Sequence, residues 1–301
     1  MSNGEGIKLA PIVLFVYNRP KHTFETLKHL SANYLASKSE LHIFADGAKN
    51  INDEKMVDVV RDIIKNAHGF LKVTIVSSEK NKGLAKSVIE GMSKIFKSFP
   101  AAIVMEDDLQ SSPDFLTFTN LALEKYEIEK KIFSISGYSY PLPILNSIQE
   151  SAFFSYRGSS WSWATWRDRW ESVNWNIENK EEFLQNTNLQ NSFNIGGNDL
   201  SFMLKKQINS EIDSWAIRFA WAAHVQNKFH LLATKSKINN IGQDNSGTHS
   251  TKTNKYFVKI QEEDIFNFPE LIEVKPEITN AIQQFFNRSF LNRIKSILSK
   301  I

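Results

Sequence analysis

Three consecutive carboxylates, Glu106, Asp107 and Asp108, follow directly after a short apolar run in this 301-residue sequence. Carboxylate oxygens are ligands that Mg²⁺ and Mn²⁺ prefer, and a bound divalent cation can in turn hold a phosphate. Acidic residues are also ordinary near the start of a helix. The triplet alone therefore leaves two interpretations open, a metal site or a solvated acidic turn.

The apolar run before the triplet, residues 101–105, is too short for a stable helix and is typical of a buried strand. Three earlier runs, residues 11–17, 41–45 and 72–76, have the same character. Segments with helical spacing separate them, at residues 21–35, 53–67 and 84–96. Alternating strands and helices predict a parallel sheet with right-handed crossovers, and the fold class is therefore expected to be α/β.

Polar residues follow each of these four strands. They are Asn18 and Arg19, then Asp46, then Lys82, then the acidic triplet. The carboxyl ends of parallel strands share one edge of the sheet, and open α/β sheets bind their ligands there. No strand is followed by a G-x-G-x-x-G turn or by a phosphate-binding G-x-x-x-x-G-K-[ST] loop. A diphosphate at this edge would therefore be neutralised mainly by a metal ion.

Four motifs, PIVLFVYNRP, FADG, NKGLAKS and VMEDDL, occur in this order across about 100 residues. Their order resembles the GT-A class of nucleotide-sugar glycosyltransferases, closest to the N-acetylglucosaminyltransferase I-like group and its bacterial relatives. The resemblance implies a GT-A, Rossmann-like fold, in which a mostly parallel central sheet is flanked by helices, and a Mn²⁺ or Mg²⁺ cofactor. It implies that Asp108 binds the metal while Glu106 and Asp107 contact the sugar or ribose of the donor.

The same resemblance assigns the earlier strand ends to the nucleotide. Asp46 would hydrogen-bond the base or ribose, and Asn18, Arg19 and Lys82 would line the nucleotide pocket. A solvated loop position is the alternative for Lys82.

Five of the seven tryptophans fall within fifteen residues of the second half. Trp163, Trp166 and Trp170 have the spacing of one helix face, which predicts three buried core residues on a helix. Aromatic faces also stack on sugars, and nearby hydroxyls can bond them. The preceding loop, with Ser159, Ser160 and Trp161, is therefore expected to contact the donor sugar, a placement that the resemblance of RGSSWSWATWRDRW also implies.

Asp213 lies at the expected start of an apolar segment that contains Trp215. An inverting sugar transfer needs a base for the acceptor hydroxyl, and the resemblance assigns this role to Asp213. A helix cap is the alternative for Asp213, and Asp199 and Glu211 are the other candidates for the base. His249 lies in a Gly- and Asn-rich loop that resembles the family's flexible loop over the donor. The resemblance gives it the metal or diphosphate as a partner, although lone histidines are more often structural.

Composition narrows the class of protein. The net charge of +3 gives no global field for nucleic acid, and the absence of cysteine excludes disulfides, thiolate catalysis and Cys-based metal sites. No run approaches the roughly 20 apolar residues of a membrane-spanning helix, and the polar N-terminus lacks a signal-peptide core. A cytoplasmic protein is expected.

The tail from residue 276 has helical apolar spacing with interleaved basic residues. Docking is favoured, either on the domain or equally on a second subunit to give a homo-oligomer. The alternative is the anionic inner face of a membrane, where lipid-linked acceptors lie.

The sequence as a whole predicts a single GT-A-like domain over residues 1–301. Residues 1–137 would bind nucleotide and metal, residues 138–268 would form the acceptor side, and residues 269–301 would form a helical tail. The predicted activity is metal-dependent, inverting transfer of a hexosyl or N-acetylhexosaminyl group. The donor would be a nucleotide sugar, expected to be a UDP-sugar, and the acceptor a glycan or lipid-linked saccharide. A sugar-phosphate nucleotidyltransferase and a non-catalytic glycan-binding protein are the alternatives.

Overall fold

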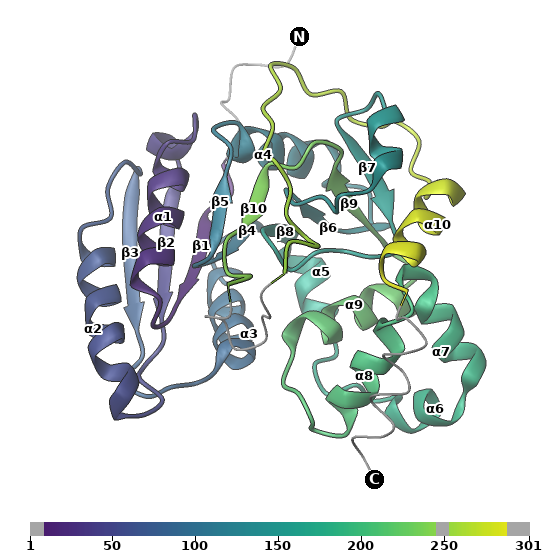
Figure 1. The fold of residues 1–301 in the computed structure, drawn as a ribbon, viewed down its shortest axis with the longest axis horizontal. Helices are drawn as coiled ribbons and strands as arrows, with labels where there is room; N and C mark the ends of the chain where they lie inside the picture. The colour runs from purple at the N-terminus through teal and green to yellow at the C-terminus, as the bar shows by residue number, and fades with distance from the viewer. Residues whose placement is uncertain (1–8, 245–252, 288–301) are drawn as a thin grey trace.

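The computed structural model of the chain describes residues 9–244 and 253–287 (Figure 1). The strands are β1 (Ile12–Val16), β2 (Glu40–Ala45), β3 (Lys72–Ser77), β4 (Ala101–Glu106), β5 (Leu109–Ser111), β6 (Ile132–Ser136), β7 (Ala152–Ser155), β8 (Trp163–Trp166), β9 (Phe229–Ala233) and β10 (Ile238–Asn240). The helices are α1 (Pro20–Ser31), α2 (Ile51–Lys65), α3 (Leu84–Ile95), α4 (Phe115–Lys125), α5 (Arg167–Glu171), α6 (Lys180–Gln185), α7 (Thr187–Phe193), α8 (Leu200–Ile208), α9 (Trp215–Val225) and α10 (Pro276–Phe285). Short 3₁₀ turns lie at Ala36–Lys38, Pro143–Ser147 and Asn194–Gly196.

The central sheet has eight strands in the order β3-β2-β1-β4-β8-β6-β9-β7. Strands β3, β2, β1 and β4 pair in parallel. Strand β8 runs antiparallel to both β4 and β6, β9 is parallel to β6, and β7 is antiparallel to β9. The expected class, an α/β fold with a mostly parallel central sheet flanked by helices, is confirmed.

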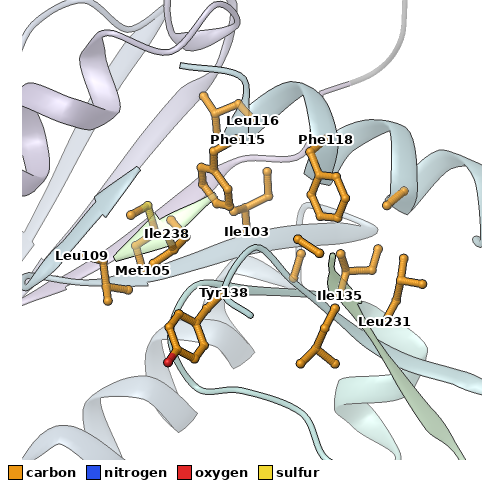
Figure 2. Packing of buried hydrophobic residues seen from close by; sticks show 14 of the residues in the cluster. Ile103, Met105, Leu109, Phe115, Leu116, Phe118, Ile135, Tyr138, Leu231 and Ile238 are labelled. Atoms are coloured by element: carbon orange, nitrogen blue, oxygen red, sulfur yellow. The ribbon is translucent and has the colours of Figure 1, made fainter. Parts of the chain in front are cut away.

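Both faces of the sheet are covered, as the burial of every residue of the apolar strand β1 shows. Alternate side chains of a strand point to opposite faces. Ile12 and Leu14 belong to a buried cluster that includes side chains of α1, α2, α4 and α10, whereas Val13 and Phe15 belong to one that includes side chains of α3, α5 and α9. Figure 2 shows the first of these clusters, where Phe115 of α4 lies against the sheet. The strand order, which this burial stabilises, determines which strand ends lie together at the carboxyl edge.

The tryptophan-rich segment differs from the prediction in its secondary structure. Trp163 and Trp166 lie in strand β8, and only Trp170 is helical, in α5. Residues three apart in a strand point to opposite faces, so Trp163 and Trp166 lie on opposite faces of the sheet. Trp163 stacks on Trp170, with ring centroids 5.7 Å apart. Trp166 packs on the other face and donates a hydrogen bond to the carbonyl of Leu123. The prediction that all three are buried is confirmed.

A buried lysine joins three distant parts of the chain. Lys237 is fully buried at the start of β10, and its Nζ lies 2.8 Å from Asp114 Oδ2, just before α4. The same ammonium lies 3.0 Å from Glu263 Oε2 and donates to the carbonyl of Gln261. Residues 253–275 have little regular structure, and this ion-pair network holds them against the domain.

The described part of the tail docks on the domain, one of the two docking modes favoured from the sequence. Ile278 and Ile282 of α10 are buried, and the ring of Phe286 packs edge-on against Tyr140 at 4.9 Å. The residues of the predicted tail from 288 onward lie outside the described residues. No helix in the described ranges combines the length and apolar character needed to cross a membrane.

Candidate active site

The acidic triplet ends β4 at the carboxyl edge of the sheet, where Arg19, next to the end of β1, meets it. Glu106 is the last residue of β4, and Asp107 and Asp108 form the turn into β5. One Nη of Arg19 contacts Asp107, and the other lies 3.0 Å from Asp108 Oδ2. The parallel pairing of β1 with β4 brings these residues together from positions almost 90 residues apart. Their predicted convergence is therefore observed.

The carboxylates carry more negative charge than one guanidinium neutralises. Burial raises the pKa of Glu106 to about 8, and the charges of Asp108 and Asp107 add to the rise while Arg19 opposes it. Burial also raises the pKa of Asp107 despite its contact with Arg19. Asp107 Oδ2 and Asp108 Oδ1 are buried and have no hydrogen-bond partner among the described residues. The cluster therefore has both the charge and the open oxygens to accept a further cation.

Asp107 Oδ2 and Asp108 Oδ1, the two oxygens without a partner among the described residues, are the atoms to which a divalent ion would bind. Mg²⁺ and similar ions are commonly held by one or two carboxylates, with phosphate oxygens and waters completing the shell. In the described ranges no group of three or more His, Asp or Glu side chains is placed to hold an ion by itself. Asp107 and Asp108 therefore suit an ion that shares its ligands with a bound diphosphate. His249, the other predicted metal ligand, lies outside the described residues.

The segment after β10 closes the acidic cluster from the other side, a feature that sequence reasoning missed. Strand β10 pairs antiparallel with β5, and the amide of Ile241 donates to the carbonyl of Asp108 at 2.9 Å. A Cβ at Gly242 would lie 2.0 Å from Asp108 Oδ2 and 2.9 Å from Arg19 Nη1. Only glycine permits this approach. The glycine in an Asn-rich loop was visible in the sequence, but its partner was not.

Asp46 and Lys82 meet through the backbone. The Asp46 carboxylate accepts hydrogen bonds from the amides of Gly47, Lys82 and Gly83, at distances between 2.9 and 3.1 Å. Asp46 therefore anchors the loop after β3, and its predicted contact with a base or ribose stays a prediction. The Lys82 ammonium lies 2.8 Å from Glu90 Oε2 on the surface of α3, and its predicted place in the nucleotide pocket stays a prediction.

Asn18 is held by the start of α2. Its Nδ2 donates to Asp53 Oδ1, and the Tyr17 hydroxyl donates to the other oxygen of the same carboxylate. The hydroxyl of Tyr17 in turn accepts from the amide of Lys49. These bonds fix the loop after β1 relative to the loop after β2. The nucleotide contact predicted for Asn18 is not tested by this geometry.

The predicted sugar-contact loop lines a pocket of about 220 Å³. Ser159, Ser160 and Trp161 form one wall of this pocket, and side chains of α8 and α9 form another. Trp163, which also lines it, pairs with Val104 of β4. Because side chains of a strand alternate, Val104 and Glu106 point to the same face of the sheet. The pocket and Glu106 therefore lie on one face, near the carboxyl end of β4.

Asp213 lies two residues before Trp215, which lines the pocket, but Asp213 itself is not among the lining residues. Its side chain is 66% exposed and accepts a hydrogen bond from Arg218 Nη2 at 2.7 Å. The helix cap is Ser214, whose Oγ accepts from the amide of Ile217. The alternative role of Asp213 as a cap is therefore wrong, and its role as a base stays a prediction.

Among the comparisons with known proteins, the comparison with solved structures is the one that gives matches. No protein-family model matches the sequence, and no curated protein does. The chain is similar to the mannosyltransferase PcManGT from Pyrobaculum calidifontis in complex with GDP-Man and Mn²⁺, with a TM-score of 0.39 and 14% identity. That match covers 55% of this chain and 49% of that one.

Two further structures match more of this chain. TarS from S. aureus has a TM-score of 0.43 and 10% identity, over 76% of this chain and 59% of that one. UDP-glucose pyrophosphorylase complexed with UDP-glucose has a TM-score of 0.37 and 12% identity, over 77% and 93%. This chain thus spans less than two thirds of the mannosyltransferase and TarS structures. These similarities concern the arrangement of the chain, and its chemistry rests on the residues described above.

The buried His230 gives a testable pH dependence. Burial lowers the pKa of His230, which lines the pocket, from its ordinary 6.5 to about 4. Between about pH 4 and 6.5 the His230 imidazole is therefore protonated in the unfolded chain but not in the folded one. The free energy of unfolding consequently falls as the pH drops from about 6.5 to 4. His230 contributes up to about 1.4 kcal/mol per pH unit to this change in the free energy of unfolding. In urea unfolding at several pH values, H230N should flatten the profile, whereas H68Q, at an exposed histidine, should retain it.

Proposed function

We propose that this chain is a nucleotide-sugar glycosyltransferase that works with Mn²⁺ or Mg²⁺. The observation that carries the proposal is the cluster at the carboxyl edge, where Asp107 and Asp108 each keep one buried oxygen without a hydrogen-bond partner. Open α/β sheets bind nucleotides at this edge. A pocket with aromatic walls lies on the same sheet face as Glu106, and we propose that it receives the sugar of the nucleotide bound at the edge.

Each group has a distinct part in the proposed reaction. A divalent cation, when bound, supplies positive charge that stabilises a departing nucleoside diphosphate. Asp108 would hold that cation, and Asp107 would join it rather than contact the donor as the resemblance implies, because its Oδ2 also lacks a partner among the described residues. Arg19, which contacts both carboxylates, would keep them oriented. Ser159, Ser160 and Trp161 would hold the sugar over the pocket. The remaining strand-end residues would position the nucleotide.

The attack on the anomeric carbon needs a base on the acceptor side. We assign this role to Asp213, because its carboxylate is accessible and Arg218 holds it in place next to the start of α9. With the hydroxyl's proton passing to this base, the acceptor oxygen would bond to the anomeric carbon opposite the departing nucleoside diphosphate. The bond from that carbon to the diphosphate oxygen would break, and this single displacement would invert the configuration. The proposed donor is a UDP-sugar carrying a hexosyl or N-acetylhexosaminyl group, and the proposed acceptor is a glycan or lipid-linked saccharide.

A donor screen by thermal shift tests the proposal. UDP-, GDP- and CMP-sugars are added with Mn²⁺, and with EDTA as the matched control. One nucleotide class is expected to raise Tm by about 5 °C at a hundredfold excess over Kd, only with the metal, because binding to the folded state alone stabilises it. A chain that no nucleotide sugar stabilises would contradict the proposal.

Two further measurements separate the alternatives. Slow metal-dependent hydrolysis of the bound donor, releasing the free sugar and the nucleoside diphosphate, distinguishes an enzyme from a glycan-binding protein. A nucleotidyltransferase would instead convert the nucleotide sugar and pyrophosphate into a nucleoside triphosphate and a sugar phosphate. Formation of the triphosphate would overturn the proposed transfer.

A further inference from the structure

The floor of the pocket beside the loop between β7 and β8 holds two buried polar groups that the proposed function has not used. They are the indole of Trp163 and the imidazole of His230, each only 2% exposed. Around them the pocket is largely aromatic, and Trp161, Trp215 and Phe219 contribute to its lining. An apolar pocket with a few convergent polar groups is the usual form of a small-molecule site.

The Trp163 indole lacks the kind of hydrogen-bond acceptor that three other buried tryptophans have. Its ring stacks on Trp215 with centroids 4.8 Å apart, while its Nε1–H has no hydrogen-bond acceptor among the described residues. By contrast, Trp166 donates to the carbonyl of Leu123, Trp170 donates to Ser93 Oγ and Trp221 donates to Asn179 Oδ1. A buried donor left unpaired is costly, and Trp163 lines the pocket, so a ligand oxygen that reached Nε1 would satisfy it.

His230 offers a second unpaired atom in the same wall. Its Nδ1 lies 2.7 Å from Ser134 Oγ, whereas Nε2 has no partner in the described part of the chain. Gly158 lets the loop close on this ring, because a Cβ there would lie 2.7 Å from Nδ1. Desolvation lowers the pKa of His230 to about 4, so the imidazole is neutral at physiological pH. The ring can therefore hydrogen-bond a ligand without attracting a negative charge.

No cationic side chain in the described lining of the pocket is free to pair with an acidic ligand. Arg157 is the one cationic residue in the described lining, and its two Nη atoms bond both Asp199 oxygens at 2.7 and 2.9 Å. Its guanidinium also lies 3.5 Å from the centroid of the Phe286 ring. A carboxylate entering this pocket would lose its water without gaining a free counter-charge, which is unfavourable.

We propose that this pocket binds the ring of an uncharged sugar, with sugar oxygens hydrogen-bonded by Trp163 Nε1 and His230 Nε2, and that it discriminates against sugars carrying a carboxylate. The inference rests on the proposed function, because the sugar is taken to be the one that the nucleotide carries. Trp161 supplies a stacking face, and the satisfied Arg157–Asp199 pair supplies the selectivity.

The indole signals of ¹⁵N-labelled protein test this directly. The W163F variant identifies the Trp163 signal, which is then followed in the wild type with Mg²⁺ while UDP-glucose, GDP-mannose or UDP-N-acetylglucosamine is added. UDP-glucuronate is the matched acidic ligand, since it differs from UDP-glucose only by a carboxylate in place of a hydroxymethyl group. Methyl glycosides of the same sugars, added without any nucleotide, probe the pocket independently of the acidic cluster.

At least one neutral sugar is expected to move the Trp163 signal downfield, while its acidic counterpart does not. The signals of Trp166, Trp170 and Trp221 should stay in place, because these indoles already have protein acceptors. W163F should weaken neutral-sugar binding about tenfold, as loss of one hydrogen bond does, and W166F should not.

A Trp163 signal that no sugar moves, free or nucleotide-linked, would assign the two polar groups to bound water and overturn the inference. An equal response to glucuronate would overturn its selectivity. Failure of the proposed function has a different signature: methyl glycosides still move the signal, but no nucleotide sugar stabilises the protein in the thermal-shift screen.

Discussion

A protein in which Asp108 is replaced by asparagine (D108N) is expected to lose metal-dependent donor hydrolysis or transfer by at least about a hundredfold. Asparagine keeps the size of the side chain but removes the charge at the oxygen that lacks a partner, Oδ1. Titration calorimetry with Mn²⁺ and the donor found in the screen measures the accompanying loss of binding. Unchanged metal-dependent binding in D108N would remove Asp108 from the metal site.

The same variant separates function from folding. Burial is the main cause of the raised pKa of Glu106, and the charges of Asp108 and Asp107 raise it further. Removing one charge lowers this repulsion in the folded state, which offsets the loss of the ion pair between Asp108 and Arg19. The free energy of unfolding of D108N should therefore be no lower than that of the wild type, even though its activity falls. D62N is the matched control, because Asp62 pairs with Lys65 on the exposed side of α2, and it should change neither quantity.

The second large effect is expected at Asp114, far from any proposed ligand. Replacing it with asparagine (D114N) leaves the fully buried Lys237 ammonium without its closest carboxylate, which lies 2.8 Å away. Breaking a buried ion pair by removing one partner costs about 3–5 kcal/mol. Glu263 Oε2 lies 3.0 Å from the ammonium, and the carbonyl of Gln261 accepts a hydrogen bond from it. Urea unfolding should therefore show a loss near the lower end of that range, because part of the compensation remains.

A double variant makes this prediction specific to the pair. K237M removes the ammonium, so adding D114N to K237M should cost much less than D114N costs alone. If D114N destabilises equally in both backgrounds, the loss belongs to the hydrogen bonds that Asp114 accepts from Ser112 and from the amide of Glu263. The ion pair would then have no role in stability.

The sheet and the acidic cluster could be predicted from the sequence because their signals are local. Residues 101–105 form one apolar run, and the carboxyl-edge rule places Arg19 near Asp107 and Asp108 without knowledge of side chains. Trp163 and Trp166 could not be placed correctly, because a spacing of three fits a helix as well as two faces of a strand. Only the pairing of β8 with β4 decides between them.

Other parts of the site depend on contacts that leave no pattern. The pairing of β5 with β10 involves three residues on each side, too few to show alternation, so the approach of Gly242 to Asp108 was hidden. The empty bonding position of Trp163 is a property of its surroundings and not of its sequence. Asp213 was expected to be either a base or a cap, and only the hydroxyl of Ser214 removes the second possibility.

The glycine that lies against Asp108 has a consequence for the order in which the chain is made. Arg19, Asp107 and Asp108 leave the ribosome more than a hundred residues before Gly242 does. Until β10 is synthesised and pairs with β5, the two aspartates have one side uncovered and the Arg19 guanidinium as their counter-charge. A nascent chain thus carries a partial counter-charge for these aspartates through synthesis, and the carboxyl edge of the sheet is completed only after most of the protein exists.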